Sequence, residues 1–466
     1  MLRYIRIIGA ILSVIAGLYV GLHEPPAGLT VPAMRGLGVI IWAVGCWVVD
    51  IVPEYIIGML MCILWVITKS VKFPQAFATF ASGTWWMIIS AFALGVAAAK
   101  CGLLRRISLF VLKLFSTSFK GQVLGFLAAG TIISPLIPSM NAKGALAAPI
   151  VHAVSKALGY KDNSTGAAGL FGAMFIAFCL TGLVFMSASV SNYVLLAMIP
   201  QQSQADITWT TWFLYAIPWG VVVLSGIGLF IIMKYKPGGA KPMSSNFAAE
   251  ELAKLGPMVR DEIITTIVLL GTLVLWITES IHKISGGEVG VVAMCILLAL
   301  KVIDREDFRK KIDWAALVYV GSIINMAGII QVLKLDKWIG HVLEPSIAAL
   351  LGNPYLFVIC VGLLMFILRF IFVSLTAASA LFILILAPLM LNYGMHPWII
   401  VFITYTYSGV FFLPYTNSMF LCSYYAVGGE MCTHRQVIPI SIAYAGLSIL
   451  ACLISIPYWQ MVGLIK

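Results

Sequence analysis

The sequence predicts an all-α polytopic membrane protein with about eleven transmembrane helices plus two re-entrant hairpins, arranged as an inverted repeat. Of its 466 residues, 61% are hydrophobic and only 10% are charged, whereas soluble domains carry roughly 25% charged residues. Proline, glycine and polar residues interrupt several apolar segments near their centres. The order of these features in the first half of the chain returns in the second half.

Composition also narrows the class of function. The net charge of +11 is typical of Lys- and Arg-rich cytoplasmic loops, and no soluble basic domain is present that could bind nucleic acid. The nine cysteines are scattered through apolar segments without a CxxC spacing, which indicates buried thiols rather than a metal site. We expect a multi-pass protein of the plasma (cytoplasmic) membrane.

The first half begins with four apolar spans and a basic helix. The spans are predicted at about residues 4–22, 31–49, 55–67 and 83–100. The first lacks a convincing small-x-small cleavage site and follows Arg3, so we expect a retained helix with a cytoplasmic N-terminus. In 102–115, Arg105, Arg106 and Lys113 fall among apolar residues at helical spacing. That pattern predicts an amphipathic helix in the membrane interface.

The first hairpin, about 121–158, contains the stretch around which the prediction is organised. Prolines and Gly144 interrupt it, and its centre reads Ser139, Met140, Asn141, Ala142, Lys143. Backbone at membrane depth stays helical unless protein buries it or it lines a wet cavity. Free N–H groups at helix starts suit an anion. A lysine at this depth is by default a functional hypothesis.

The first half closes with a broken span. The span at about 167–199 is interrupted at 186–192, where Ser187, Ser189, Ser191 and Asn192 lie close together. This polar patch predicts an unwound point. After a sixth span at about 211–233, the hydrophilic segment 234–261 is predicted to be a cytoplasmic linker that joins the two halves.

The second half repeats this order. Spans are predicted at about 263–281, 289–302, 313–332 and 437–456, with an amphipathic turn at 333–339. A second hairpin covers about 355–390 and carries Ser374, Thr376 and Ser379 at its centre. The span at 396–425 is broken at 413–418, where Thr416 and Asn417 follow a proline. The alternation of sides makes this an inverted repeat, in which paired breaks indicate a substrate site.

Several motifs together resemble the divalent anion:sodium symporter family, which comprises dicarboxylate and citrate carriers. WVVDIVPEYIIGML resembles the family's W-x-x-E-x-x-P pattern, with Asp50 at the acidic position. GLLRRISL resembles its interfacial helix, and TWFLYAIP resembles the entry to its sixth span. The resemblance covers nearly the whole chain and rests on the order and spacing of these motifs.

The resemblance implies a homodimer that works by an elevator mechanism. Residues 1–80 and 262–312 would form the scaffold with helices 1–3 and 7–8. Residues 81–233 and 313–466 would form the two halves of the transport domain. Membrane lipid and small di- or tricarboxylate anions are the implied partners, and no cofactor is implied apart from a sodium ion, which is disfavoured.

The chain departs from the family's sodium-binding motifs. Counting back from Pro149 and Pro388 puts the two Ser-Asn-Thr positions at 139–141 and 378–380. The two Thr-Pro-Pro-Asn positions read Ser189-Val190-Ser191-Asn192 and Tyr415-Thr416-Asn417. Oxygen ligands are fewer, and Lys143 lies beside one motif. An ammonium about 4 Å from a sodium ion would oppose its binding by ~4 kcal/mol at an effective dielectric of about 20. This favours anion exchange, with sodium symport as the alternative.

The predicted substrate site therefore combines both hairpins and both breaks. Its residues are Ser139, Met140, Asn141, Lys143, Ser189, Ser191, Asn192, Thr376, Ser379, Thr416 and Asn417. No HExxH, GxSxG or paired intramembrane aspartate supports an enzyme. A channel is disfavoured because the polar groups cluster at one depth.

Other ionisable residues receive structural interpretations. Asp50 and Glu54 are assigned to a turn between scaffold helices rather than to proton coupling. Arg369 is expected near the outer face of the second hairpin, paired or reaching the interface, rather than as a second cationic centre. His152 is assigned no part in proton coupling. Lys143 itself could alternatively reach the cytoplasmic interface.

Overall fold

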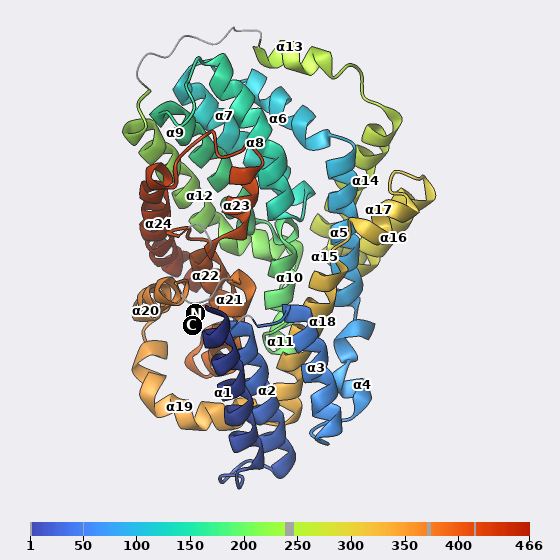
Figure 1. Cartoon of the computed structure of the whole chain (residues 1–466), viewed down its shortest axis with the longest axis vertical. Coiled ribbons are helices and arrows are strands. Elements are labelled where there is room, and N and C mark those ends of the chain that lie inside the picture. Colours follow the sequence, from blue (N-terminus) through green and yellow to red (C-terminus); the bar gives the residue numbers. More distant parts are fainter. Residues whose placement is uncertain (1, 50, 238–246, 371–373, 414–415) are drawn as a thin grey trace.

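The computed structural model describes residues 2–49, 51–237, 247–370, 374–413 and 416–466. Within these ranges the chain is helical, with one isolated bridge between Met395 and Ile465 and no β-strand (Figure 1). The predicted all-α membrane class is therefore confirmed. Asp50, Pro414, Tyr415 and part of the predicted linker lie outside the described residues.

Helices α1 to α4 lie at one end of the molecule, and α5 lies beside α16 (Gly286–Ala299) nearer its middle (Figure 1). The N-terminal elements are α1 (Leu2–Leu22), α2 (Val31–Val49), α3 (Glu54–Ile67), α4 (Phe73–Ala76), the 3₁₀ turn Ala78–Ala81 and α5 (Gly83–Lys100). Helix α1 packs on α2 and leaves Ile7, Ile11 and Ile15 exposed. An apolar face without protein cover is what a lipid-facing helix presents.

The first hairpin follows the interfacial helix α6 (Leu103–Lys113). It comprises α7 (Phe119–Ile133), the short turn η2 (Ser134–Leu136) and α8 (Met140–Ala157). Pro135 and Pro138 stop α7 from continuing because proline lacks the N–H that the next turn would need. The chain then restarts as α8 and leaves a helix start at the tip.

The first broken span is more irregular than the sequence predicts. It runs through α9 (Thr165–Phe175), a π-helical stretch η3 (Ile176–Leu180), the 3₁₀ turns η4 (Thr181–Val184) and η5 (Met186–Ala188), and α10 (Val190–Leu196). The π-helical stretch is a geometry often found at functional sites. The short α11 (Gln201–Gln204) and the long α12 (Trp209–Lys234) follow.

The described middle of the chain forms six helices, of which α14 packs on α16. The helices are α13 (Phe247–Lys254), α14 (Arg260–Ile277), α15 (Glu279–His282), α16 (Gly286–Ala299), α17 (Arg305–Lys310) and α18 (Trp314–Val332). Arg106 of α6 forms an ion pair with Glu262 at the start of α14 and donates to the carbonyl of Gly256 at 2.9 Å. This pair ties the interfacial helix α6 to the start of the second half.

The second half of the chain differs from its prediction in two places. It contains α19 (Leu335–Leu351), α20 (Pro354–Leu368), α21 (Leu375–Met390), the 3₁₀ turn Leu391–Tyr393, α22 (Trp398–Ser408), α23 (Ser418–Tyr425) and α24 (His434–Met461). The predicted amphipathic turn at 333–339 is wrong, because it opens the 17-residue helix α19. The last helix extends beyond 437–456 at both ends, since Thr433 and Gln436 form a capping box at its start.

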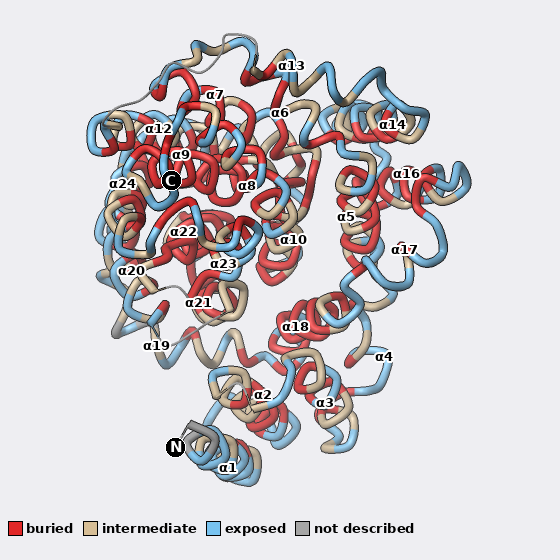
Figure 2. The backbone as a smooth tube through the Cα atoms, turned by 45° about the horizontal axis from the view of Figure 1, so that its top comes forward, coloured by how far each residue is buried: buried red, intermediate tan, exposed pale blue. Residues whose placement is uncertain are grey.

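The helices assemble into two groups (Figure 2). In one, α5 packs on α16, α14 packs on α16, and α18 packs on α3. In the other, α8 of the first hairpin lies against α23 of the second broken span, and α21 of the second hairpin lies against α10 of the first broken span and α22 of its own half. Buried residues concentrate in this second group (Figure 2). The crossed packing brings the two tips and the two breaks together.

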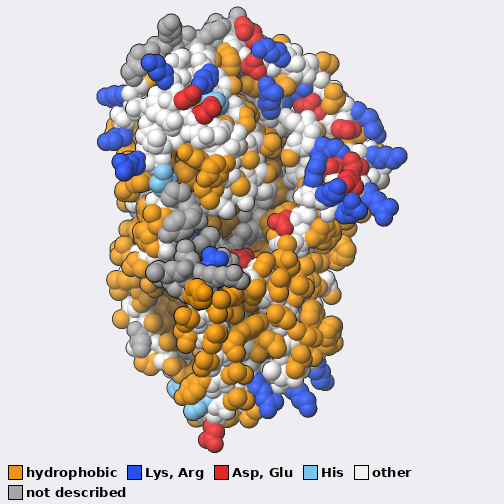
Figure 3. Space-filling view, in the orientation of Figure 1, with side chains coloured by type: hydrophobic (Ala, Val, Ile, Leu, Met, Phe, Trp, Pro, Cys, Tyr) orange, Lys and Arg blue, Asp and Glu red, His pale blue; other side chains and the backbone are white. Residues whose placement is uncertain are grey.

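The surface is that of a protein embedded in lipid. In the described residues, eight helical segments are long and apolar enough to cross a membrane, and five shorter apolar helices accompany them. Hydrophobic side chains cover much of the face in Figure 3, and charged side chains gather at its upper end and over α17. Multi-pass membrane insertion is thus confirmed, while the side on which the N-terminus lies stays a prediction.

Candidate functional site

A cavity of about 890 Å³ lies where the two hairpin tips and the two breaks meet. From the first hairpin it is lined by Pro138, Ser139, Met140, Asn141 and Ala142. From the first break it is lined by Ser189, Val190 and Ser191. The second hairpin contributes Ser374, Leu375 and Thr376, and the start of α23 contributes Ser418 and Met419. The four regions that the sequence singled out therefore share one cavity wall.

The first tip is a helix start capped by its own serine. The Ser139 hydroxyl accepts the N–H of Ala142 at 3.2 Å, which satisfies one of the free donors of α8. Asn141, the second residue of α8, is exposed to the cavity, and no hydrogen bond of its side chain is found in the described chain. Asn141 thus presents a free amide to a ligand.

The second tip follows the same plan with a different register from the predicted one. Ser374 caps α21 by accepting the N–H of Ala377 at 3.3 Å, and Thr376 is the second helical residue. Ser374 and Thr376 therefore correspond to Ser139 and Asn141. The predicted alignment at 378–380 is wrong, because the proline that served as reference lies about one helical turn farther from this cap than in the first hairpin.

The two breaks also end in capped helix starts. Ser189 caps α10, and its hydroxyl accepts the N–H of Ser191 at 3.2 Å. Asn417 caps α23 by accepting the N–H of Phe420 at 3.0 Å. Four helix N-termini of the described chain thus converge on one cavity. Each carries free N–H groups and the positive end of a helix dipole, an arrangement that binds anions.

Hydrogen bonds between these segments fix the walls of the cavity. The Thr376 hydroxyl lies 3.2 Å from that of Ser191, which joins the second hairpin to the first break. The N–H of Val190 donates to the carbonyl of Pro138 at 3.2 Å, which joins the first hairpin to the same break. Ser189 is held at 3.0 Å by the hydroxyl of Tyr405. A ligand would therefore meet a preorganised set of donors.

Lys143 is fully buried and lies behind the first tip rather than on the cavity wall. Its ammonium donates to the carbonyl of Ala188 at 3.2 Å and to that of Ser134 at 3.5 Å. These carbonyls end η5 and α7, where the helix dipole is negative. No carboxylate within the described residues pairs with Lys143. The alternative of reaching the cytoplasmic interface is wrong.

Gly182 makes room for this ammonium. A Cβ at this position would lie 3.1 Å from the Nζ of Lys143 and 2.9 Å from the hydroxyl of Ser134. A larger residue would force one of these groups to move. The 3₁₀ turn that contains Gly182 therefore forms part of the pocket that surrounds the ammonium.

The other predicted site residues support the walls from inside. Asn192 is buried and donates to the carbonyls of Phe185 and Met186 at 3.0 and 3.2 Å. Ser379 is buried and donates to Leu375 within α21. Thr416 donates to Leu413 at 2.8 Å, and the side-chain amide of Asn417 donates to Gly409 at 2.9 Å. None of these four side chains lines the cavity.

Ser187, also singled out by sequence, connects two structural elements. It donates to the carbonyl of Pro135 at 2.8 Å and accepts from the indole of Trp209 at 3.0 Å. It therefore fixes the first hairpin to the start of α12. Asn192 and Ser187 together show that polar residues of the first break satisfy backbone carbonyls of the unwound segments.

Two further predictions concern the ionisable residues Arg369 and His152. Arg369 is 1% exposed, so the alternative in which it reaches the interface is wrong, whereas the alternative of a paired side chain is not contradicted. His152 lies 3.4 Å from Glu430 and 3.7 Å from Asp162. These three residues form the group of described side chains best arranged for a metal ion. Lys156 already pairs with Asp162 at 2.5 Å, so the group is better described as an ion-pair cluster.

Sequence reasoning missed several residues that line the cavity. Tyr405 and Tyr319 come from the interiors of α22 and α18, where an aromatic residue resembles ordinary packing. Glu54, Lys100, Lys311 and Asp313 also line the cavity, and we call these four residues its charged end. Glu54 was assigned to a structural turn, and the other three to membrane boundaries. Boundary charges of this kind are common, so no sequence signal separates them from ordinary interfacial residues.

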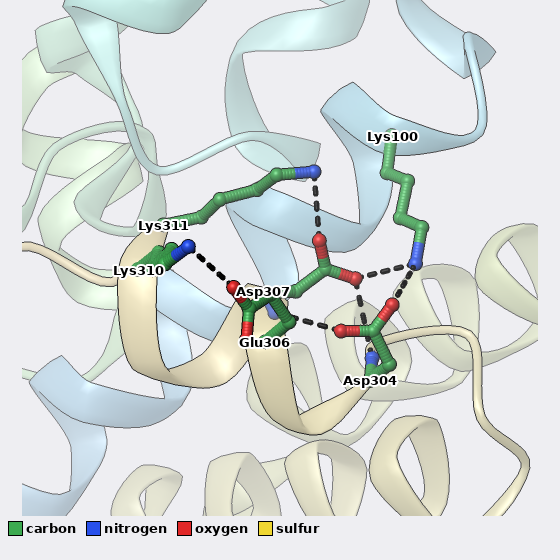
Figure 4. Close-up of polar contacts among 6 residues, drawn as sticks. All are labelled: Lys100, Asp304, Glu306, Asp307, Lys310 and Lys311. Atoms are coloured by element: carbon green, nitrogen blue, oxygen red, sulfur yellow. Dashed lines mark hydrogen bonds and ion pairs between the residues drawn. The ribbon is translucent and has the colours of Figure 1, made fainter.

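The charged end of the cavity belongs to an ion-pair network (Figure 4). The Asp307 carboxylate binds Lys100 of α5 and, at 2.7 Å, Lys311 after α17. Asp304 binds Lys100 at 3.1 Å and forms a reciprocal capping box with Asp307 at the start of α17. Burial raises the pKa of Asp307, but hydrogen bonds from Lys100 and Lys311 outweigh it and hold that pKa well below its ordinary value.

Comparisons with known proteins agree with this arrangement. The chain is 24% identical over 352 residues to the putative malate transporter YflS of Bacillus subtilis, which covers 74% of this chain and 73% of that one. It is 29% identical to the inner membrane protein YbhI of Escherichia coli over 76% of each chain. It is 26% identical to the L-tartrate/succinate antiporter of Escherichia coli, over 68% of this chain and 65% of the antiporter.

The fold has a distant counterpart among solved structures. The YdaH transporter of Alcanivorax borkumensis superposes over the full length of both chains with a TM-score of 0.60 and 13% identity. At that identity the likeness concerns the fold alone. The family described as the sodium:sulfate symporter transmembrane region matches residues 5–465, and this protein belongs to that divalent anion symporter family.

Proposed function

We propose that this protein is a secondary active transporter of di- or tricarboxylates that works by anion exchange. The convergence of four capped helix N-termini on one cavity carries the proposal, because these groups offer N–H donors and positive dipole ends to an anion. Relatives named as a malate transporter and an L-tartrate/succinate antiporter support succinate, malate, 2-oxoglutarate or citrate as the substrate class. A transporter needs no catalytic residues, and we assign none.

Direct substrate contacts are proposed for the residues that line the cavity. Asn141 and Thr376 stand at equivalent positions of the two tips, with Ser139 and Met140 beside Asn141. Ser189 and Ser191 add hydroxyl groups from the break between them. Hydroxyl, amide and backbone N–H donors suit carboxylate oxygens, which only accept hydrogen bonds when ionised.

Lys143 takes a different part in this proposal. Its ammonium occupies a set of backbone carbonyls at the ends of α7 and η5, where a transporter of this kind could otherwise hold a metal cation. With no acidic partner among the described residues, the buried charge is left for the substrate anion to compensate. Crossing the membrane without substrate would then carry an uncompensated buried charge, which is unfavourable. Exchange follows because only the loaded protein moves readily.

The movement is proposed to be of the elevator type. The hairpins and both broken spans form one packed group, which would carry the site. The packing of α5 on α16 and of α18 on α3 favours assigning α5 and α18 to the fixed group. This differs from the division implied by the family resemblance, which put residues 81–100 and 313–332 in the moving part. A homodimer remains part of the proposal on the family resemblance.

Proteoliposome uptake tests the proposal. Vesicles loaded with unlabelled dicarboxylate, and matched empty vesicles, would be given labelled succinate, malate, 2-oxoglutarate or citrate with and without external sodium. We expect uptake only into loaded vesicles and at the same rate without sodium. Sodium-dependent uptake into empty vesicles would contradict exchange and the part assigned to Lys143. Absence of counterflow with all four acids would contradict the substrate class.

A further inference from the structure

The cavity extends beyond the space that one small dicarboxylate needs. Pockets of roughly 300–1,000 Å³ hold drug-sized ligands, and this cavity measures about 890 Å³. Lys100 of α5 and Lys311 after α17 also line it, and both lie far in sequence from the four helix starts. The site proposed above uses neither lysine. The proposed substrate site therefore leaves these two lysines without a function.

Both lysines are held at the cavity wall by one nearly buried carboxylate. Asp307 is 4% exposed, and its capping box with Asp304 fixes its orientation at the start of α17. Lys100 binds Asp307 and Asp304, whereas Lys311 binds only Asp307, at 2.7 Å (Figure 4). The lysine side chains are 32% and 53% exposed. Both lysines line the cavity, whereas Asp307 is not among its lining residues.

Each of the two ammonium groups has N–H donors that its ion pairs do not use. A lysine has three N–H donors and no acceptor. Lys311 uses one on Asp307, and Lys100 uses one each on Asp307 and Asp304. Two carboxylates, Glu54 and Asp313, line the same cavity, and the Asp313 carboxylate accepts the N–H of Ala316 at 2.9 Å. An anion at this end of the cavity would find free N–H groups from two different segments.

We propose that Lys100 and Lys311 form a second anion subsite, which captures a dicarboxylate at the charged end of the cavity before it reaches the hairpin tips. The inference rests on the proposed function, and it adds an encounter site to that function. Partly exposed ammonium groups bind such an anion weakly. Weak binding suits a transit site, because the anion has to leave it for the tips.

The adjacent residue Lys310 provides a matched control. It carries the same charge, is 63% exposed, and forms its ion pair with Glu306 instead of Asp307. It does not line the cavity. Lys311→Gln and Lys310→Gln therefore remove the same charge from neighbouring positions, but only the first removes an ammonium from the cavity wall. Lys311→Arg restores the charge and the donors.

The test measures initial exchange rates in proteoliposomes over a range of external succinate concentrations. We expect Lys311→Gln to raise KM about 3- to 10-fold with little change in kcat, because one partly screened charged hydrogen bond is lost. Lys310→Gln should leave KM near the wild-type value, and Lys311→Arg should restore most of it. Added inert salt should raise the wild-type KM and reduce the difference in KM between wild type and Lys311→Gln.

Four outcomes would overturn the inference. Equal KM values for Lys311→Gln and Lys310→Gln, or a gap that salt does not narrow, would overturn the subsite and leave exchange intact. Wild-type vesicles without dicarboxylate exchange would overturn the proposed function and this inference with it. Lys100→Gln gives a second measurement from α5, and we expect it to raise KM in the same direction. A fall in kcat alone for both lysine variants would indicate a structural role and contradict the proposal.

Discussion

The two hairpin tips share a plan and differ in one charge. Ser139 and Ser374 cap their helices, and Asn141 and Thr376 occupy the second helical position at the cavity. At the fourth position the first tip has Lys143, whereas the second has Ala378. Both side chains are fully buried. A repeated scaffold therefore supplies donors from both sides but a fixed positive charge from one side only.

The difference follows from what surrounds the fourth position. Behind the first tip, the carbonyls of Ser134 and Ala188 accept hydrogen bonds from the ammonium of Lys143, and Gly182 leaves room for it. The second hairpin buries its own cation, Arg369, ahead of the tip rather than after it. A buried charge is tolerated where its hydrogen bonds are satisfied. The positive charge of the first tip therefore depends on the backbone carbonyls that accept its hydrogen bonds.

The largest expected effect comes from giving the second tip the residue of the first. Ala378→Lys would bury an ammonium where alanine now packs, and an uncompensated buried ion destabilises by about 3–5 kcal/mol. We expect little folded protein in detergent, measured by size-exclusion chromatography and thermal unfolding. Ala378→Met, of similar length and uncharged, separates charge from volume. If both variants unfold alike, volume alone explains the loss, and the charge comparison between the tips fails.

The converse change removes the charge from the first tip. Lys143→Ala deletes charged hydrogen bonds worth about 1.5–3 kcal/mol, so we expect exchange to fall about 10- to 100-fold or uptake to become dependent on sodium. Lys156→Ala, at the exposed end of the same helix, serves as control because its partner Asp162 lies outside the cavity. Unchanged KM and kcat in Lys143→Ala would remove the lysine from the mechanism.

A smaller effect is expected from the second helical positions. Asn141 has a free amide, whereas the hydroxyl of Thr376 already contacts Ser191 at 3.2 Å. We therefore expect Asn141→Ala to raise KM for dicarboxylate about tenfold, and Thr376→Val to raise it about threefold, for losses near 1 kcal/mol. The KM values are measured from initial exchange rates of the two variants in proteoliposomes. The reverse order would indicate that the second tip makes the stronger contact.

The smallest effect concerns pH at the charged end. Because the folded pKa of Asp307 is depressed, its ion pairs stabilise the fold fully above the ordinary aspartate value of about 3.9. That contribution is lost as the pH falls through the lower folded pKa. The difference in thermal stability between wild type and Asp307→Asn should thus be constant from about pH 5 to 8. A difference that disappears within that range would contradict the assigned pairing.

Much of the fold could be predicted from the sequence because helices that cross a membrane need long apolar runs, which are easy to recognise. The helices at Val31–Val49 and Gly83–Lys100 begin and end at the predicted residues, since apolar runs of this length have few alternatives in a bilayer. The helix α19 was missed because Pro345 and its charged residues resemble a surface turn. Family membership followed from motif order and is confirmed by the match over residues 5–465.

The site was predicted only in outline. Prolines and polar residues marked both tips and both breaks, which share one cavity. The sequence alone did not separate residues that face the cavity, such as Asn141, from those that satisfy backbone groups, such as Asn192 and Ser379. It also gave the wrong register for the second tip, because the distance from cap to proline differs between the hairpins.

The sequence by itself determined the membrane class, the positions of the helix breaks and the presence of a lysine beside one of them. These are local properties of hydropathy, proline geometry and capping. Only the tertiary structure decided that Lys143 faces carbonyls behind the tip, that Tyr405 holds Ser189, and that Lys100 and Lys311 share Asp307 across distant segments. The reason is physical: the direction of a side chain and its partner depend on how helices far apart in sequence pack, which no local pattern specifies.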